Sequence, residues 1–419
     1  MFKPLIAALF VSASLALASL PARAATPEAV LNTYSDIAQA MYGDALRSAR
    51  HLLRKVETLT AKPSEQNLIA ARDAWIAARV PYQQTEVYRF GNPIVDEWEG
   101  RVNAWPLDEG LIDYVDSEKY GESSDANPWY GANIIANPKL EIGGRKVDTS
   151  RITWRTLRGL QEVGGVEANV ATGYHAVEFL LWGQDLNGTG PGAGNRPWTD
   201  YAKGAACTNG NCDRRAAYLL VATQLLVDDL VWMAGQWGPQ GEARKHLLAD
   251  PNAGIATMVT GLGSLAYGEL AGERMKLGLL LHDPEEEHDC FSDNTHNSHY
   301  YNVVGMQAIY LGRYGKISGP GLTALVAEKA SALDSEMRGK LDASLAAMGK
   351  VKQRAETVER YDQMLAEGNA EGAAVLEGAI AALIDQTRTL ERISAALQLG
   401  KVAFEGSDSL DSPDKVGKK

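Results

Sequence analysis

Residues 173–183 constrain the fold most, because this segment is apolar on almost every side and yet carries two ionisable groups, His175 and Glu178. A helix places positions three apart on the same face, so the imidazole and the carboxylate project together. Their apolar neighbours imply that this face is buried or lines a cleft. Buried ionisable groups without partners cost on the order of several kcal/mol. A metal ion, a polar ligand or a mutual hydrogen bond would each satisfy the pair.

Two interpretations of this pair stay open. In the first, a His175–Glu178 hydrogen bond only fastens one helix to the next, since buried histidines are ordinary in protein cores. In the second, the pair belongs to a binding site. Gly173 favours the second, because a glycine lets a substrate or a neighbouring helix approach the backbone closely. The glycine-rich residues 183–188 also end the helix abruptly beside the same place.

The pattern Gly-x-His-x-x-Glu at residues 173–178 resembles the motif of the imelysin family. Three further stretches, spread over the region from residue 70 to residue 300, are similar to that family in the same order. They are AWIAARVPY at 74–82, WPLD at 105–108 and DCFSDNTH at 289–296. The motif alone is weak, but the ordered set is fairly specific. The resemblance implies two related helical domains packed together, a role in bacterial iron uptake, and a grouping with an insulin-cleaving peptidase.

The first residues have the features of a cleavable export signal. Lys3 provides a positive start, residues 5–20 are apolar, and Ala22-Arg23-Ala24 forms an A-x-A cleavage site. We therefore predict a signal peptide at 1–24 and a periplasmic mature protein. The cleavage site has no neighbouring cysteine that could carry a lipid, so we expect no lipid anchor. No later stretch has about 18 consecutive apolar residues, so we expect no membrane span.

The charge of the chain limits its partners. The formal net charge is −12, and it becomes −14 without the signal segment, which contains two cations and no acids. Nucleic-acid binding needs a basic face, so this class of partner is excluded. An acidic protein is instead compatible with cationic ligands, including metal ions.

Two of the three cysteines flank an Asn-Gly turn, which would bring Cys207 and Cys212 together in an oxidising compartment. We therefore predict a local disulfide between them. Cys290 is left over.

Helical periodicity dominates the rest of the chain and predicts an all-α fold of two packed bundles. Helices are expected at 27–59, 65–90, 213–237, 253–281, 301–313, 320–350 and 353–399. The glycine- and proline-rich residues 187–211 suggest a domain boundary, so we place one bundle at 25–200 and the other at 201–400. The polar residues 401–419 are expected to be a disordered tail.

Residues 91–165 form a long irregular insertion in the first bundle, rich in Trp and Tyr, with a possible small hairpin at 140–147. Such long connections tend to be functional or disordered, and the aromatic content favours an ordered one. Asp108, Glu109 and Asp113 could contribute acids to the central site. Glu86, on a helical stripe with Arg79 and Tyr82, is a further candidate wall residue; the alternative is an interhelical packing seam.

A second group of metal-binding side-chain types lies at 282–299, which holds four of the seven histidines. The secondary candidates are His282, His288, Cys290, Asp293 and His296. The alternative is a solvated acidic loop, because the spacing matches no tetrahedral metal template. We expect this segment to lie at the domain interface near His175.

Three functions follow from these observations. The first is a periplasmic protein that binds iron, zinc or an iron-bearing ligand through His175 and Glu178, with Glu86 or Asp108 completing the site. Non-covalent haem on His175 is a variant of it, and an outer- or inner-membrane iron transport component would be the partner. The second is the metallopeptidase that the family resemblance implies, although His-Glu-x-x-His is missing and the inverted motif would need a histidine where Phe179 stands. The third is a non-catalytic scaffold.

Overall fold

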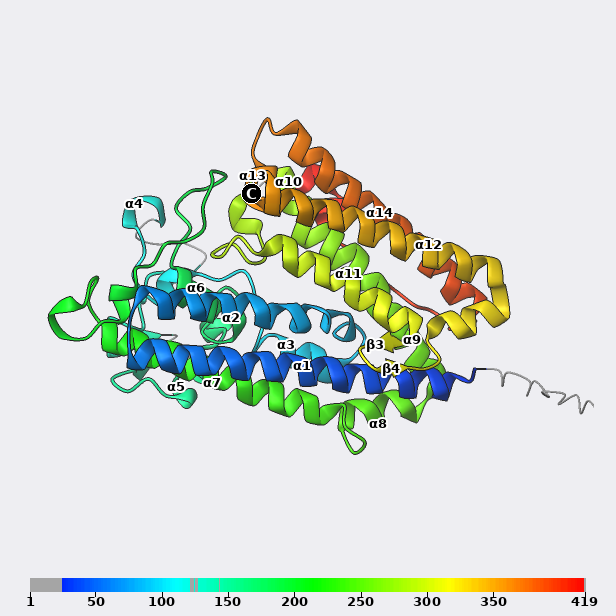
Figure 1. The fold of residues 1–419 in the computed structure, drawn as a ribbon, viewed down its shortest axis with the longest axis horizontal. Coiled ribbons are helices and arrows are strands. Elements are labelled where there is room, and N and C mark those ends of the chain that lie inside the picture. The colour runs from blue at the N-terminus through cyan, green and yellow to red at the C-terminus, as the bar shows by residue number, and fades with distance from the viewer. Residues whose placement is uncertain (1–24, 121–123, 125–126, 143, 418–419) are drawn as a thin grey trace, which may run out of the picture.

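The computed structural model describes residues 25–417, apart from 121–123, 125–126 and 143. The predicted signal peptide at 1–24 therefore lies outside the described residues. Figure 1 shows two groups of long helices, inclined to one another, with an irregular region at one end.

The first bundle is organised around α1 (Pro27–Ala61), which packs along both α2 (Glu65–Gln83) and α7 (Cys212–Gln236). The side chain of Thr26 caps α1 by accepting a hydrogen bond from the backbone N–H of Ala29 at 3.2 Å. The short α6 (Gly173–Trp182) lies against α7 and α2, and every one of its residues is buried. The helix that carries the predicted motif is therefore in the core.

The second bundle packs α11 (Thr295–Leu311), α12 (Leu322–Thr357) and α14 (Ala370–Ala396) together. Its fourth long element is a continuous helical rod, formed by α9 (Pro251–Ser264), η6 (Leu265–Lys276) and α10 (Leu277–Leu281). The middle part of this rod, η6, is a π-helix. The bundles meet where α2 contacts α11 and α1 contacts α9, and one buried apolar core continues through both. The predicted all-α fold of two packed bundles is confirmed.

Short elements connect these helices. The remaining elements are η1 (Glu86–Tyr88), α3 (Pro93–Glu99), η2 (Glu109–Leu111), α4 (Ser117–Tyr120), β1 (Lys139–Ile142), β2 (Arg145–Asp148), α5 (Trp154–Leu160), η3 (Val163–Gly165), η4 (Trp198–Tyr201), η5 (Gly204–Ala206), α8 (Glu242–Ala249), η7 (Pro284–Glu286), β3 (Arg313–Tyr314), β4 (Ile317–Ser318), α13 (Tyr361–Leu365), α15 (Asp408–Asp411) and η8 (Pro413–Lys415). The expected hairpin is present: β1 pairs antiparallel with β2, with Leu140 opposite Val147.

Several helices begin or end at other residues than the sequence periodicity predicts. The second helix was expected to reach residue 90, but α2 ends at Gln83. Pro81 has no N–H to donate in the last turn of the helix. The Thr85 hydroxyl donates a hydrogen bond to the carbonyl of Tyr82 at 2.7 Å just after the helix ends. The final break lies at 358–369 rather than near residue 351. Helix α7 begins after residue 200, where we predicted the second domain, but it packs along α1 of the first bundle. The domain boundary at residue 200 stays a prediction.

Helix α7 is also long and apolar enough, by length and composition, to cross a membrane. More than half of its most apolar window is buried inside the fold, and a core helix passes the same test. At its start, Cys212 forms a disulfide with Cys207.

A buried charge cluster orders the irregular insertion. Asp113 accepts from Arg196 at 2.8 Å and from Arg215 at 2.5 Å, and Arg196 also pairs with Asp200 at 3.0 Å. All four side chains are essentially inaccessible to solvent. Because Arg215 lies on α7, the cluster ties two loops to the first bundle.

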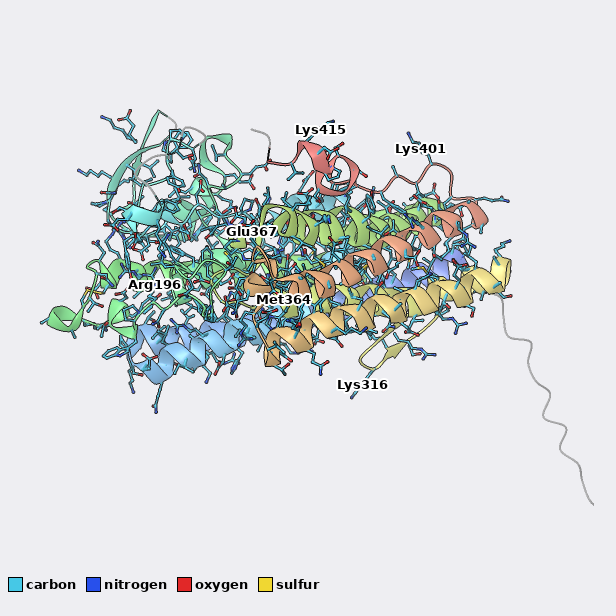
Figure 2. The ribbon with its side chains drawn as sticks, turned by 90° about the horizontal axis from the view of Figure 1, so that it is seen from above. Arg196, Lys316, Met364, Glu367, Lys401 and Lys415 are labelled. Carbon is cyan, nitrogen blue, oxygen red and sulfur yellow. A yellow bond between two sulfur atoms is a disulfide. The ribbon has the colours of Figure 1, made fainter. Side chains whose placement is uncertain are left out.

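The expectation of a disordered tail at 401–419 was wrong for the residues described. The segment runs along the second bundle, where Figure 2 labels Lys401 and Lys415, and Ser409 donates to the carbonyl of Gly272 at 2.9 Å. Glycines on the η6 rod make room for it: a Cβ at Gly268 would lie 2.5 Å from the carbonyl oxygen of Glu405. The polar composition of this segment therefore did not indicate that it packs on the second bundle.

Candidate metal centre

Gly173 begins α6 in a conformation that only glycine adopts easily. Its φ is +89°, and a Cβ there would lie 2.6 Å from the carbonyl of Val102. The next residue, Tyr174, donates its N–H to that same carbonyl at 2.7 Å. The backbone that approaches this glycine is therefore the chain at Val102, and the contact fixes where α6 starts.

His175 and Glu178 form the hydrogen bond that their spacing allows. The Nδ1 of His175 lies 3.0 Å from Oε2 of Glu178, and both side chains are buried. The other oxygen, Oε1, accepts from the N–H of Ser292 at 3.1 Å and from its hydroxyl at 2.6 Å. The Nε2 of His175 has no hydrogen-bond partner within the described residues. Glu178 thus orients the ring and leaves one buried nitrogen open.

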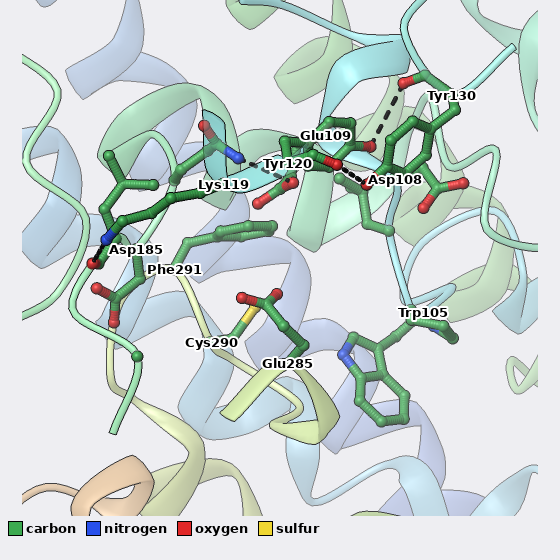
Figure 3. A pocket seen from close by; sticks show the side chains of 15 residues that line it. Trp105, Asp108, Glu109, Lys119, Tyr120, Tyr130, Asp185, Glu285, Cys290 and Phe291 are labelled. Carbon is green, nitrogen blue, oxygen red and sulfur yellow. Dashed lines mark hydrogen bonds between the residues drawn. The ribbon is translucent and has the colours of Figure 1, made fainter. Parts of the chain in front are cut away.

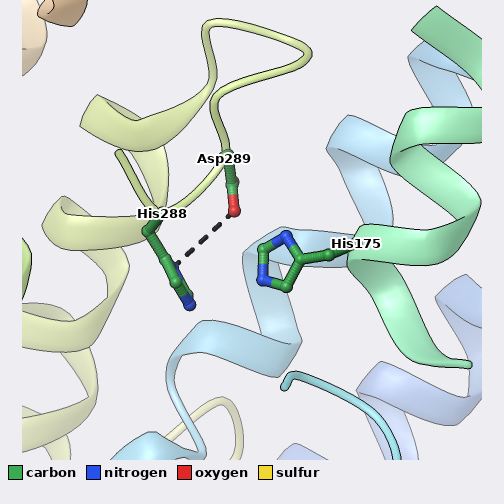
Figure 4. Close-up of side chains that lie close together, drawn as sticks. All are labelled: His175, His288 and Asp289. Atoms are coloured by element: carbon green, nitrogen blue, oxygen red, sulfur yellow. Dashed lines mark ion pairs between the residues drawn. The ribbon is translucent and has the colours of Figure 1, made fainter. Parts of the chain in front are cut away.

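The loop before α11 brings two more ligand residues to the His175 side chain. The rings of His175 and His288 lie 4.8 Å apart, edge to face, and Asp289 follows directly (Figure 4). One ligand atom from each of these three residues falls within 4.8 Å of the other two. Two imidazoles and one carboxylate form a donor set suited to iron and to zinc. The prediction that residues 282–299 approach His175 is confirmed for His288 and Asp289, while Ser292 contacts Glu178.

Arg79 is the resident cation of this centre. Its guanidinium contacts Asp289 at 2.7 Å and Asn103 at 2.6 Å, and it stacks over the Tyr174 ring at 5.0 Å. Asp289 also accepts from Asn294 at 2.9 Å and from Ser298. The carboxylate is therefore fully paired, so a metal ion would have to take the place of one of these donors.

The surroundings set the protonation states. Burial, and then the charge of Arg79, lowers the pKa of His175 to about 3, and burial likewise lowers the pKa of His288 well below its usual value. Burial opposes ionisation of Asp289, but Arg79 outweighs it and lowers the pKa of that carboxyl to about 2. Burial and the charge of Asp289 raise the pKa of Glu178. Neutral imidazoles beside an ionised carboxylate are the forms that bind metals.

A larger pocket adjoins the centre. It has a volume of about 370 Å³, and its walls include the carboxylates of Asp108, Glu109 and Glu285 (Figure 3). The Tyr120 and Tyr130 rings stack in its wall with centroids 3.9 Å apart. Trp105 lines the pocket and also meets the His288 ring edge-on at 5.9 Å. The indole therefore lies between the pocket and the buried imidazoles.

Comparison with known proteins identifies the family. The sequence model described as Imelysin matches residues 38–390. The chain belongs to the imelysin family. It is 35% identical over 71 residues to a protein from Synechococcus elongatus called iron-regulated protein A. That match covers 17% of this chain and 20% of that relative's length.

Two solved imelysin-type structures share the fold. One is of a putative iron-regulated protein A precursor from Parabacteroides distasonis, with a TM-score of 0.62 and 19% identity over 90% of this chain and 97% of that chain. The other is an imelysin-like protein from Psychrobacter arcticum, with a TM-score of 0.58 and 16% identity over 91% of this chain and 99% of that chain. At these identities the likeness establishes the shared helical fold.

The acidic residues expected to complete the site have other partners in the structure. Glu86 forms an ion pair with Arg274 at 2.7 Å, and Asp108 faces the larger pocket, where it accepts from Asn127 at 2.5 Å. Each is therefore engaged elsewhere in this structure, and Asp289 is the carboxylate beside the imidazoles. Glu109 accepts from Gln184 at 3.2 Å.

The secondary candidates separate into three places. His288 lies in the centre, and Cys290 lines the larger pocket. His282 is exposed at the end of α10 and contacts the carbonyl of Leu365 at 2.7 Å. Asp293 and His296 are buried, and each has one side-chain atom without a hydrogen-bond partner in the described structure.

Sequence reasoning missed Asp289 and Asn103 as parts of the centre. The only local signal for Asp289 was its position next to His288 inside a stretch that resembles the imelysin family. Asn103 donates to Glu99 at 3.0 Å and accepts from Arg79. Because it lies in the irregular insertion, no periodic pattern in the sequence indicated its role.

Proposed function

We propose that this imelysin-family protein is an exported protein of bacterial iron uptake that binds iron, or another transition metal of similar preference, through His175, His288 and Asp289. One observation carries the proposal: the buried Nε2 of His175 has no partner in the described structure, and the His175 side chain lies beside a second imidazole and a carboxylate. An unpaired buried nitrogen costs roughly 1–3 kcal/mol, which a bound metal would recover.

Glu178 then acts as the positioning residue of the centre. Burial raises the pKa of Glu178 in the metal-free protein, and a metal on Nε2 would favour the form in which an ionised Glu178 accepts the Nδ1–H of His175. The two donors from Ser292 stabilise this charge. Glu178 would therefore raise the basicity of the ring and fix its orientation, and Asp289 would supply the directly bound oxygen.

The names of the relatives support an iron ligand, and the N-terminal sequence pattern supports export. The cyanobacterial relative and one structural neighbour are called iron-regulated protein A, and the latter is described as a precursor. An exported binder would deliver its cargo to a membrane iron transport component, which is part of the proposal.

Peptide hydrolysis receives no support from this geometry. A catalytic metal needs an open position for substrate and water. His175 and His288 are each 1% exposed, and the Trp105 indole stands between His288 and the larger pocket. A peptide could not reach the buried centre without rearrangement of these side chains.

Metal analysis tests the proposal. Purified protein would be dialysed anaerobically against ferrous iron, and separately against zinc, beside the His175→Ala and His288→Ala variants. We expect stoichiometric metal in the parent and its loss in both variants, with circular dichroism showing that they remain folded. The exposed His246 provides the matched control, since His246→Ala should keep the metal.

Two outcomes would contradict the proposal. Equal metal content in the parent and both centre variants would move the site elsewhere. Cleavage of denatured insulin or casein by the loaded parent protein, but not by His175→Ala, would make the protein an enzyme and not a carrier.

A further inference from the structure

A second group of carboxylates lies apart from the imidazoles, where three distant segments meet. A small cavity of about 10 Å³ is enclosed by the chain after α6, the loop before α11 and the start of α13. Its lining carboxylates are Asp185, Glu285, Glu287 and Asp362. The cavity adjoins the larger pocket and shares Asp185 and Glu285 with it (Figure 3).

Two of these carboxylates are buried without partners. Glu287 is 1% exposed and Asp362 is 2% exposed. None of their four oxygens has a partner at hydrogen-bond geometry among the residues described, and both side chains line the cavity. Only weaker contacts, from Thr295 to Glu287 and from the backbone of Gln363 to Asp362, favour their ionised forms. Native structures leave few buried polar groups unsatisfied, and each one needs an explanation such as an ion.

No cation of the described chain pairs directly with the group, although Lys119 acts on Asp185 from a distance. Within the described part of the chain, no Lys, Arg or His forms an ion pair with any of the four carboxylates. Arg360 partly offsets the charge of Asp362, but its guanidinium donates to the carbonyl of Ala355 at 3.2 Å. Burial and the charge of Asp185 raise the pKa of Asp362 to about 7. The cavity therefore gathers four carboxyl groups whose ionisation the protein opposes, and which a bound cation would favour.

The chemistry of the donors indicates the class of cation. Four carboxylates offer only oxygen atoms, which hard cations such as Ca²⁺ prefer, whereas the centre at His175 offers nitrogen as well. The cavity has about the room that one water or one ion needs. Ligands from three separate segments form an irregular set, which Ca²⁺ tolerates and Mg²⁺, with its strict octahedral geometry, does not.

We propose that Asp185, Glu285, Glu287 and Asp362 hold one hard divalent cation of the Ca²⁺ type. The ion joins the chain after α6 in the first bundle to α13 in the second, with the loop before α11 between them. The site goes beyond the proposed iron function, because it contains no imidazole and does not require His175.

Calcium titration of the purified protein tests the site. Isothermal calorimetry with CaCl₂ should show saturable binding by the parent, and the melting temperature should rise with calcium. In the Glu287→Gln, Asp362→Asn double variant, calcium binding should weaken roughly tenfold or more, because half of the ligand charge is lost. Without calcium this variant should melt no lower than the parent, since uncharged amides remove the repulsion.

Matched variants separate the possible results. Glu371→Gln with Glu377→Gln removes the same charge from exposed positions on α14 and should keep calcium binding. His175→Ala should lose iron and keep calcium, so that failure of one site is distinguishable from failure of the other. Absence of calcium binding by the parent, equal affinity in the two double variants, or equal stabilisation by Mg²⁺ would overturn the proposal.

Discussion

Arg79 supplies the positive charge that the buried Asp289 needs when no metal is present. Arg79→Gln should therefore lower the free energy of unfolding of the metal-free protein by about 3–5 kcal/mol, because it leaves a buried carboxylate without its cation. The same change should tighten metal binding, since the guanidinium no longer competes for Asp289. Urea unfolding and metal titration would measure the two effects.

Arg72 is the control for this prediction, because it lies two turns earlier on α2 and donates to the carbonyls of Leu181 and Arg196. Arg72→Gln should lower stability and leave metal affinity unchanged. If Arg79→Gln weakens metal binding, the guanidinium is part of the ligand site and not its competitor.

Asp113 should give a distinct pH dependence to stability. Although burial opposes it, Arg196 and Arg215 lower the pKa of this carboxyl below its unfolded value of about 3.9. Its contribution is therefore complete above that value and is lost as the pH falls through the folded pKa. Asp113→Asn should lower stability near neutral pH and flatten the acid limb of the curve of unfolding free energy against pH. An unchanged acid limb would show that the cluster does not govern acid unfolding.

At the scale of elements, the π-helix η6 and the C-terminal segment are packed as one unit. In the full chain, Gly268→Ala should be destabilising, because its Cβ would meet the backbone at Glu405 and Gly406. In a chain shortened to end at residue 400, the same substitution should stabilise by about 0.5–1 kcal/mol through helix propensity. Thermal unfolding of the four proteins would measure this reversal. The same sign in both chains would show that the tail does not dock on the rod.

The elements differ in how far the sequence predicts them. Periodicity located the long helices, and the Asn-Gly turn indicated the contact between Cys207 and Cys212, because these signals are local. The docked tail had no such signal, since what holds it is a set of glycines more than a hundred residues earlier. The candidate metal centre could be predicted only in part, because some of its residues are not close in sequence. His175 and Glu178 share one helix, whereas Asp289 reaches them only through the tertiary fold.

At the scale of the molecule, the proposed metal centre lies between the bundles, and its imidazoles are buried. Trp105 lines the larger pocket and contacts His288, so we expect metal to enter past its indole. Trp105→Ala should speed metal association severalfold and leave the dissociation constant nearly unchanged, because the indole supplies no ligand atom. Stopped-flow mixing with ferrous iron would measure the rate. The exposed Trp154 offers a control, since Trp154→Ala should leave the rate as it is. An unchanged rate in Trp105→Ala would place the route elsewhere.

The central claim is that iron is held by both bundles at once, through His175 of α6 and through His288 and Asp289 of the loop before α11. X-ray absorption at the iron edge of the ferrous-loaded protein tests it most directly. We expect scattering from two imidazole rings in the parent protein and from one ring in His175→Ala. A first shell made only of oxygen atoms, identical in the parent and in the variant, would contradict it.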